Sequence, residues 1–277
     1  MAPKFGKSGL RGLVSELTPE LIADYTLAFL SSCDTGGRIW IGHDLRASSP
    51  AFSQVIADTA FKAGVEVVLA GPVPTPALAL AAAGAGAVMV TGSHIPADRN
   101  GLKFYTRAGE ITKEDENAIT ASLGRHAADG GPGRVYRAPE VGERFADRYT
   151  KAFGPTALVG RKVGVYSHSA VGRDLLMATL QRLGAQVVEL DRSASFVPVD
   201  TEAVEPDTRG SLKKWAAAHC LDAIVSMDGD SDRPLVTDET GCVVPGDILG
   251  QITAEFLGAE AVVTPISSNS GVTEKTC

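Results

Sequence analysis

The alternation of apolar and polar positions divides the chain into repeated units. Gly36–Gly71 contains an apolar strand pattern, a polar loop, an amphipathic helix pattern and a Val-rich strand. Gly160–Leu190 repeats that order. Strand–helix–strand units of this length are typical of right-handed crossovers between parallel strands. The pattern therefore predicts tandem repeated α/β domains with mixed, largely parallel sheets.

The two helices of these units have recognisable ends. Ser49 followed by Pro50 predicts an N-cap and a first helical position. Gly64 and Gly184 stand where a glycine beyond a helix C-terminus is expected. Between the copies, Ala127–Glu140 is rich in Gly and Pro without periodicity and predicts a linker or long surface loop. A helix is expected after it, from about Val141 to Phe153.

We expect three parts in the chain: residues 1–155, 156–246 and 247–277. The last is interpreted as the incomplete start of a third α/β domain, with a helix pattern over Gly246–Gly258 and one strand pattern over Ala261–Ser267. A single helix and strand bury too little apolar surface to offset their ordering entropy. Five apolar residues of this helix are therefore expected to be partly exposed or to pack back on the second domain: Ile248, Leu249, Ile252, Phe256 and Leu257.

Each copy is followed by a short strand that ends in a polar loop. The strand pattern Gly86–Val90 leads into "TGSH", and the pattern Leu221–Met227 leads into "DGDSDRP". Ligands of open α/β sheets usually bind at the carboxyl ends of strands. We therefore expect one site between the two copies, built from two chemically different loops.

Composition narrows the class of protein. The chain has 277 residues, of which 44% are hydrophobic and 21% charged, as in a globular protein. A formal charge of −7 argues against nucleic acid or an anionic membrane as the main partner. The four cysteines show neither a CxxC motif nor the spacing of a disulfide framework, and the N-terminus has no apolar segment like that of a signal peptide. Both features predict a cytoplasmic protein. Val67–Ala97 lacks charged residues, but its Pro and Gly residues favour buried α/β core over a membrane span.

The acidic loop indicates a metal site. Asp228, Asp230 and Asp232 alternate with small residues, and at ~5 Å and an effective dielectric of ~20 each carboxylate pair costs about 3 kcal/mol. Oxygen ligands without Cys or His favour Mg²⁺ or Ca²⁺. The plainer alternative is a solvated acidic turn. An EF-hand does not fit, because Arg233 occupies the position that needs glycine and the flanks alternate like strands.

Ser93 beside such a metal suits phosphoryl transfer. Arg11, Lys103 and Arg233 would offset the charge of a seryl phosphate, and that chemistry depends mainly on positioning and charge stabilisation. Taken singly, each of these side chains, like His94, is most simply an ordinary loop or surface residue. A Ser-His-Asp hydrolase is the other enzyme interpretation, but the chain lacks a G-x-S-x-G motif.

Three motifs in this order, "SGLRG", "TGSHIPADRNGLKFY" and "DGDSDRPLV", make the whole chain resemble the α-D-phosphohexomutase family of phosphomannomutases and phosphoglucomutases. The resemblance implies an isomerase that moves phosphate between C1 and C6 of a hexose through a phosphoserine and a bisphosphorylated sugar. Hexose phosphate would be the substrate, with Mg²⁺ and a hexose 1,6-bisphosphate as cofactors.

The resemblance also implies roles for individual residues. Ser93 would be the phosphorylated nucleophile, and its phosphate would share the Mg²⁺ with the three loop aspartates. Arg11 and Arg233 would steady the transferring group, and Lys103 and His94 would be the acid–base candidates.

The sequence departs from the family pattern in places. Gly92 and Ile95 stand where the family loop more often has Ala and Asn, and Ser231 stands where Gly or Ala is usual. Family members have four domains, and this chain ends early in the third, so we expect a truncated chain with very low mutase activity. The alternative is a non-catalytic remnant that binds metal or a partner. The choice between mannose and glucose and the oligomeric state stay open.

Overall fold

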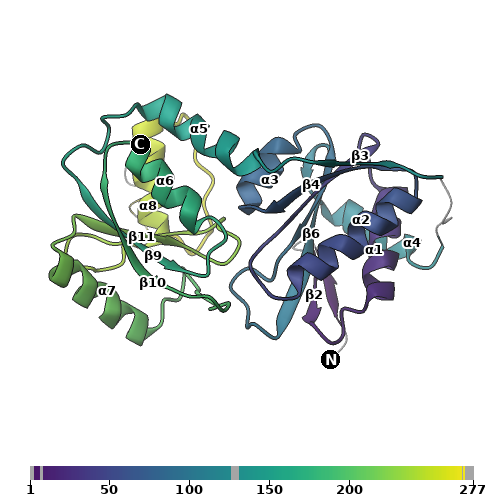
Figure 1. Cartoon of the computed structure of the whole chain (residues 1–277), viewed down its shortest axis with the longest axis horizontal. Coiled ribbons are helices and arrows are strands. Elements are labelled where there is room, and N and C mark those ends of the chain that lie inside the picture. Colours follow the sequence, from purple (N-terminus) through teal and green to yellow (C-terminus); the bar gives the residue numbers. More distant parts are fainter. Residues whose placement is uncertain (1–2, 7–8, 126–130, 270, 272–277) are drawn as a thin grey trace.

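The computed structural model describes residues 3–6, 9–125, 131–269 and 271. Figure 1 shows two lobes, each with its own sheet, joined across the top by helix α5 (Val141–Phe153). The first unit contains β1 to β8 with α1 to α4, and the second unit contains β9 to β12 with α6 to α8. Both sheets are mixed, so the predicted pair of α/β domains is confirmed.

The first sheet has eight strands: β1 (Lys4–Gly6), β2 (Gly9–Leu13), β3 (Arg38–His43), β4 (Glu66–Pro72), β5 (Gly86–Val90), β6 (Arg99–Thr106), β7 (Gly109–Glu110) and β8 (Arg134–Arg137). Their order is β1-β2-β6-β5-β3-β4-β8, with β7 paired to β6. The strands β5, β3, β4 and β8 run parallel, while β6, β2 and β1 add antiparallel strands beyond β5. The loops after β3 and β5 therefore leave the same edge of the sheet.

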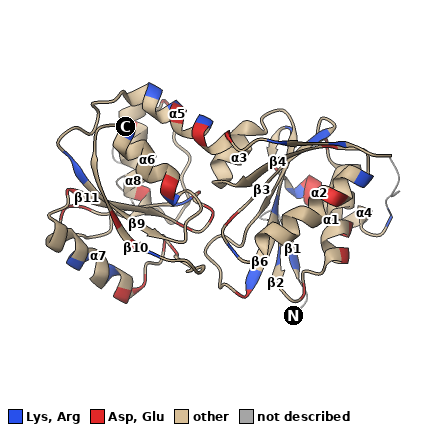
Figure 2. Cartoon of the chain, viewed as in Figure 1, with Lys and Arg blue, Asp and Glu red and all other residues tan. Residues whose placement is uncertain are grey.

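Helices cover both faces of the first sheet: α1 (Pro19–Ser32), α2 (Ser49–Lys62), α3 (Thr75–Ala81) and α4 (Lys113–Ser122). Neighbouring strand residues belong to different cores, because side chains alternate between the faces. Val67 and Val88 pack with α1, α2 and α4, whereas Val68 and Met89 pack with α3. Helix α3 carries no charged residue (Figure 2) and also contacts α5. The first unit is thus three layers thick.

The second unit is lighter. Its sheet has the order β10-β9-β11-β12, formed by β9 (Lys162–His168), β10 (Gln186–Arg192), β11 (Ala223–Met227) and β12 (Pro234–Val236). Helix α7 (Pro206–His219) packs Leu212 and Ala216 into a core with Ile224. Helix α6 (Arg173–Arg182) lies on the other side of the sheet and contacts α5, and α8 (Gly246–Leu257) brings Phe256 close to Phe153 of α5 (Figure 1). Neither α6 nor α8 has a buried residue.

Most predicted boundaries agree with the structure. Helix α5 has the predicted bounds, and Gly64 and Gly184 have φ angles of +81° and +97° at the ends of their helices. One boundary was wrong by a residue. The N-cap of α2 is Ser48, which makes no side-chain capping bond, and Ser49 lies inside the helix. The Ser49 hydroxyl donates instead to Oδ1 of the buried Asp44 carboxylate, at 2.6 Å.

The predicted linker was also partly wrong. Residues 126–130 of it lie outside the described residues, but Arg134–Arg137 forms β8 and pairs in parallel with β4. All four residues of β8 are exposed, so no alternation of buried and exposed positions marks this edge strand, and the backbone ladder with β4 holds it in the sheet. Gly133 allows the close approach, since a Cβ there would lie 2.2 Å from the Val65 carbonyl oxygen.

The last part of the chain contains the predicted helix but not the predicted strand. Residues 261–265 form no strand and pair with none of the described strands. The apolar residues of α8 are partly exposed as predicted, with Ile252, Phe256 and Leu257 at 55%, 72% and 68%. Val67–Ala97 forms β4, α3 and β5, and no helix of the described residues is long and apolar enough to cross a membrane.

Candidate active site

The two polar loops predicted to face each other do meet between the units. Ser93, which follows β5, and Asp228, which follows β11, are both buried. The Ser93 hydroxyl donates to Asp228 Oδ2 at 2.5 Å. Gly229 allows this approach, because a Cβ at that position would lie 2.8 Å from the Ser93 carbonyl oxygen. A serine and an acidic cluster therefore share one site.

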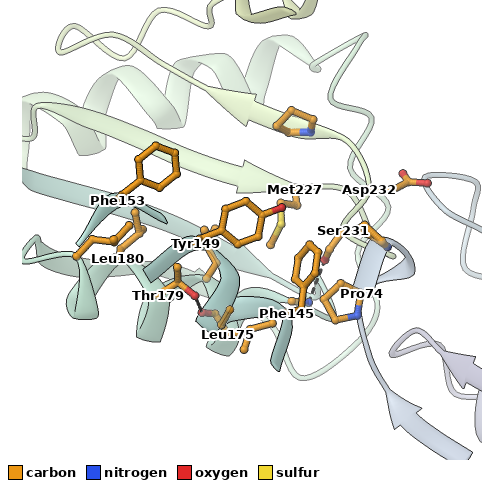
Figure 3. A pocket seen from close by; sticks show the side chains of 16 residues that line it. Pro74, Phe145, Tyr149, Phe153, Leu175, Thr179, Leu180, Met227, Ser231 and Asp232 are labelled. Atoms are coloured by element: carbon orange, nitrogen blue, oxygen red, sulfur yellow. Dashed lines mark hydrogen bonds between the residues drawn. The ribbon is translucent and has the colours of Figure 1, made fainter. Parts of the chain in front are cut away.

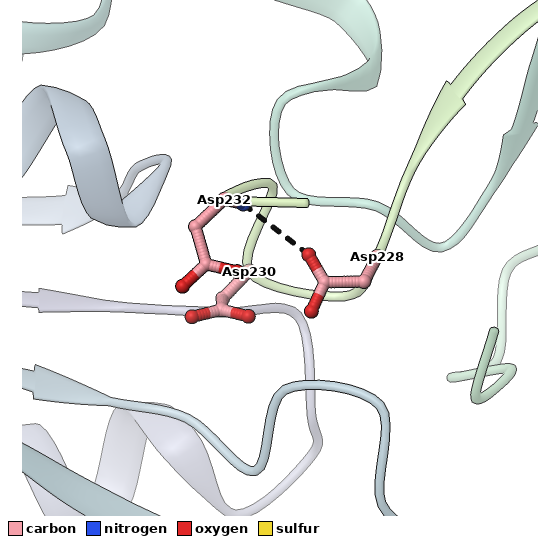
Figure 4. Close-up of side chains that lie close together, drawn as sticks. All are labelled: Asp228, Asp230 and Asp232. Atoms are coloured by element: carbon pink, nitrogen blue, oxygen red, sulfur yellow. Dashed lines mark hydrogen bonds between the residues drawn. The ribbon is translucent and has the colours of Figure 1, made fainter. Parts of the chain in front are cut away.

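The three aspartates converge around a tight turn (Figure 4). Each offers a carboxylate oxygen within 4.8 Å of the other two. The loop is curled here, because Ser231 has a φ of +62° and the Asp232 amide donates to Asp228 Oδ1 at 3.2 Å. The turn gathers the carboxylates more closely than alternation along a strand would.

Lys103 neutralises part of this cluster. Its Nζ donates to Asp230 Oδ2 and to Asp232 Oδ2, both at 2.7 Å. Burial acts to lower the pKa of Lys103, but the two carboxylates outweigh it and the pKa is raised. Burial likewise acts to raise the pKa of Asp230, and the nearby ammonium more than offsets it, so that pKa is lowered. Lys103 and Asp230 are therefore both charged at neutral pH.

Lys103 alone does not neutralise the three carboxylates of the cluster. Burial and the neighbouring Asp230 carboxylate raise the pKa of Asp228 to about 7. Asp230 Oδ1 is buried and has no hydrogen-bond partner among the described residues. Thr75 holds the other oxygen, since its hydroxyl donates to Asp230 Oδ2 at 2.6 Å. A free, fixed carboxylate oxygen beside two further carboxylates fits a hard divalent cation such as Mg²⁺.

The two predicted arginines occupy different places. Arg11 lies on β2 opposite Gly101 of β6, and its Nε is buried without a hydrogen-bond partner among the described residues. Arg233 follows the acidic loop and is partly exposed. Its Nη1 lies 3.1 Å from Glu202 Oε1, and its Nε lies 4.0 Å from Asp232 Oδ1. Arg11 thus has an unused donor near the serine loop, while Arg233 is engaged by the second unit.

His94 contacts the serine hydroxyl. Its Nδ1 lies 3.4 Å from Ser93 Oγ, and its Nε2 lies 3.9 Å from Asp200 Oδ2 of the second unit. The left-handed backbone of Ser93, with a φ of +52°, turns the two neighbouring side chains toward each other. The short hydrogen bond of the serine nevertheless goes to Asp228, so the arrangement is not that of a hydrolase triad.

Sequence reasoning missed several buried polar residues that support the site: Asp44, Arg46, Thr75 and Thr91. Asp44 and Arg46 follow β3, whose carboxyl end lies beside that of β5. The segment "HDLR" was visible as a polar loop after an apolar strand, and the rule that located Ser93 applies to it equally. Thr75 had no such signal, because it begins a short apolar helix.

A cavity of about 480 Å³ lies behind the acidic loop. Figure 3 shows Tyr149 of α5, Leu175 of α6 and Met227 of β11 around it, with Ser231 and Asp232 at its edge. The lining is mainly apolar and includes no Lys or Arg. This cavity therefore does not suit a phosphate, and we place the candidate site on the Ser93 side of the loop.

Comparison with protein families gives two matches along the chain. Residues 2–128 match phosphoglucomutase/phosphomannomutase α/β/α domain I, and residues 143–241 match α/β/α domain II. The two matches take in the serine loop and the acidic loop respectively.

Curated relatives agree. A phosphomannomutase of Sinorhizobium fredii is 45% identical over 98% of this chain and 60% of its own length. A phosphomannomutase of Salmonella muenchen is 44% identical over 97% of this chain and 57% of its own length. A phosphoglucosamine mutase of Rhodococcus opacus is 32% identical over 98% and 65%. The chain thus spans about 60% of the length of the phosphomannomutases that it matches.

Solved structures show the same fold. A phosphoglucomutase/phosphomannomutase family protein of Burkholderia thailandensis superposes with a TM-score of 0.78 at 24% identity, over 92% of this chain and 59% of that one. Parafusin of Paramecium gives a TM-score of 0.68 at 16% identity, over 92% and 57%. With both domain matches in chain order, this protein belongs to the phosphoglucomutase/phosphomannomutase family, whose domains I and II it carries.

Proposed function

We propose that this chain is the phosphoryl-transferring part of a phosphohexomutase, in which Ser93 carries the phosphate that moves between C1 and C6 of a hexose. The observation that carries the proposal is the 2.5 Å contact of the Ser93 hydroxyl with a buried three-aspartate cluster. A serine without a role in chemistry would not be expected to lie against a buried cluster of three carboxylates. The relatives named phosphomannomutase support a hexose phosphate as the substrate.

Asp228, Asp230 and Asp232, together with the seryl phosphate, would hold Mg²⁺. When bound, the ion would stabilise negative charge on the transferring phosphoryl group. The unpartnered Oδ1 of Asp230 supports this assignment, because a buried carboxylate oxygen is costly to leave without a partner. Lys103 already neutralises one charge of the three carboxylates, so Mg²⁺ would balance the other two, and the added charge of the phosphate would be left to Arg11 and Arg233.

The transfer step follows from the side chains around Ser93. With Asp228 engaged by the ion, the Ser93 hydroxyl would turn from Asp228 to His94; its oxygen attacks a phosphorus of a hexose 1,6-bisphosphate, and its proton passes to His94 Nδ1, 3.4 Å away. The bond between that phosphorus and the sugar oxygen breaks, and Lys103 donates a proton to the sugar. The unused Nε of Arg11 binds the transferring group, and Arg233 exchanges Glu202 for a phosphate oxygen. The reverse step returns the phosphate to the other sugar carbon.

The second candidate is a non-catalytic protein of the same fold that binds metal or a partner. It requires only the cluster of Asp228, Asp230 and Asp232, without transfer to Ser93. The chain spans about 60% of the length of the phosphomannomutases that it matches, and we propose that mutase turnover by these residues alone is very low.

Intact-mass spectrometry separates the two candidates. The chain is incubated with Mg²⁺ and glucose or mannose 1,6-bisphosphate, and a gain of about 80 Da is expected from one covalent phosphate. Peptide mapping should place it on Ser93, and Ser93→Ala should gain nothing. Ser267→Ala, which alters an exposed serine, is the matched control and should behave like the parent. No gain in the parent with either sugar would favour the non-catalytic candidate.

A further inference from the structure

Arg46 is the largest fully buried side chain among the described residues, with 1% of its surface exposed. It follows β3 and was not among the residues expected at the site. A buried guanidinium is costly unless each of its donors is paired. Its surroundings therefore indicate what the residue holds in place.

The guanidinium pairs almost entirely with one loop. Nη2 donates to the carbonyl oxygens of Ser93 and Ile95 at 3.0 and 2.6 Å. Nη1 donates to those of Pro96 and Arg99 at 2.7 and 2.8 Å. Three of these carbonyls, those of Ser93, Ile95 and Pro96, belong to the turn between β5 and β6, and the fourth belongs to Arg99, the first residue of β6. One side chain thus joins four backbone oxygens of this segment, in addition to the backbone hydrogen bonds that the turn makes itself.

Asp44 holds the other side of the same serine. Its Oδ2 accepts from Arg46 Nε at 3.2 Å and from the Thr91 hydroxyl at 2.8 Å. Thr91 Oγ1 in turn accepts the backbone N–H of Ser93 at 2.8 Å. Gly92 makes room for the guanidinium, since a Cβ there would lie 2.7 Å from Arg46 Cζ. Both backbone groups of Ser93 are therefore fixed by one buried ion pair.

The second unit covers this ion pair with an aromatic ring. The ring of Phe196 lies 3.9 Å from Arg46 Cζ, a cation–π distance. The same ring lies against the acidic loop, since a Cβ at Gly229 would be 2.9 Å from it. The segment that carries Phe196 is anchored to its own unit, because Arg173 donates to the Ser193 carbonyl at 2.8 Å. Phe196 therefore touches the supports of both chemical loops.

We infer that Arg46 is a positioning residue, which holds Ser93 in its left-handed conformation opposite Asp228, and that Phe196 holds Arg46 from the second unit. The left-handed φ of +52° at a serine has to be imposed by its surroundings. The four carbonyl contacts impose it. The catalytic meaning of this inference rests on the proposed function, while the structural meaning does not.

The test compares Arg46→Gln with the parent by two measurements. Hydrogen exchange of the segment that contains Thr91 to Ile95 is expected to be at least tenfold faster in Arg46→Gln, with no change in β9. The rate of Ser93 phosphorylation by the hexose bisphosphate should fall about a hundredfold, because a small misplacement of a reacting group has that effect. Its dependence on bisphosphate concentration should stay the same, since Arg46 is 1% exposed and its guanidinium is paired with protein atoms.

Three further variants sharpen the result. Arg46→Lys keeps the charge but not the planar fork, so it should resemble Arg46→Gln in both measurements. Phe196→Leu should slow phosphorylation three- to tenfold, as expected for a lost cation–π contact. Arg38→Gln, at a half-exposed arginine paired with Glu66, is the matched control and should leave both measurements unchanged.

The inference is overturned if Arg46→Gln exchanges and is phosphorylated within twofold of the parent, or if it only lowers the melting temperature. A parent that takes no phosphate contradicts the proposed function, and the exchange measurement then decides the role of Arg46 alone. If Arg46→Gln does not fold, faster exchange of the serine loop in Phe196→Leu supports the inference, and unchanged exchange there overturns it.

Discussion

The two units differ in how firmly each holds its chemical loop. The sheet of the first unit is buried by helices on both faces, and its two cores meet across the strands that end at the serine loop. The second unit has one core, beneath α7, and its other face borders a cavity of about 480 Å³ beside α6. Ser93 thus lies on the more fully packed unit and the acidic loop on the less packed one. We therefore expect that destabilising the second unit disturbs the contact between the serine loop and the acidic loop before destabilising the first unit does.

The same truncation in each core tests this difference with the largest expected effect. Leu102 of the first unit and Leu212 of the second are both fully buried. Leu→Ala at either site should lower the free energy of unfolding of its own unit by about 3 to 4 kcal/mol. We expect calorimetry to show two transitions, with the lower one shifted by Leu212→Ala and the upper one by Leu102→Ala.

Leu80→Ala is the control for that experiment, because Leu80 is 45% exposed and its loss should change either transition little. One transition that both core variants lower equally would contradict independent units. It would mean that the contact between the loops couples them into a single cooperative structure.

Lys103 allows a second test, of the contact itself. It belongs to the first unit and pairs with two aspartates of the second, so Lys103→Met leaves three clustered carboxylates without their cation. Removing one partner of a buried ion pair costs about 3 kcal/mol or more. We expect that loss in metal-free buffer, and substantial recovery in Mg²⁺, because the ion would replace the missing charge. Thermal unfolding with and without Mg²⁺ measures both.

Arg107→Met is the matched control, since Arg107 pairs with Asp34 at the surface and should change stability little in either buffer. If Mg²⁺ stabilises Lys103→Met no more than it stabilises the parent, the assignment of the three aspartates to a metal site is wrong.

Sequence alone located both chemical loops but not their supports. Ser93 and Asp228 stand out because each follows an apolar strand, and strand ends gather at one edge. Arg46 stands out less, because its partners are carbonyl oxygens about fifty positions further along the chain. Every residue has a backbone carbonyl, so no sequence motif indicates which carbonyls Arg46 binds. The bridging position of Lys103 likewise depends on how the two units approach.

The fold was predictable where periodicity was strong. The strands before both loops and the helix Val141–Phe153 agree with their patterns. The edge strand Arg134–Arg137 has no buried side chain and so no pattern to detect. The strand expected at Ala261–Ser267 had the right residues but lacks a partner strand, and a strand is stable only when it is paired.

The third prediction asks whether acid weakens the second unit through one histidine. His168 is buried at the end of β9 and donates its Nε2–H to the Met227 carbonyl at 2.7 Å. Burial lowers the pKa of His168 to about 4. In the unfolded chain the ordinary value is about 6.5, so below that pH protons bind the unfolded state first. The stability that neutral His168 contributes is complete above pH 6.5 and is lost as the pH falls toward 4.

His168→Asn removes this titration while keeping a residue that tolerates the φ of +26°. Between pH 7.5 and 5, the stability advantage of the parent over the variant should shrink by about 2 kcal/mol. Urea unfolding at several pH values measures the difference, in which the other titrating groups cancel. Parallel pH profiles for the two proteins would contradict the buried, neutral histidine.

The smallest effect is expected where the second unit is least packed. Phe256 of α8 is 72% exposed, and its one aromatic neighbour among the described residues is Phe153, at 6.0 Å between ring centroids. Phe256→Ser should therefore change the free energy of unfolding by less than about 0.5 kcal/mol. It should reduce self-association, since contiguous exposed apolar residues favour contacts between molecules. Urea unfolding measures the free energy of unfolding, and sedimentation at rising concentration measures the self-association.

Phe145→Ser is the contrasting variant, because the ring of Phe145 packs against Tyr149 and the core beside α3. It should lower the free energy of unfolding by a few kcal/mol. A loss above about 1 kcal/mol for Phe256→Ser would show that α8 belongs to the packed structure of the second unit, and the contrast between the two units would then be smaller than the exposed face of α8 indicates.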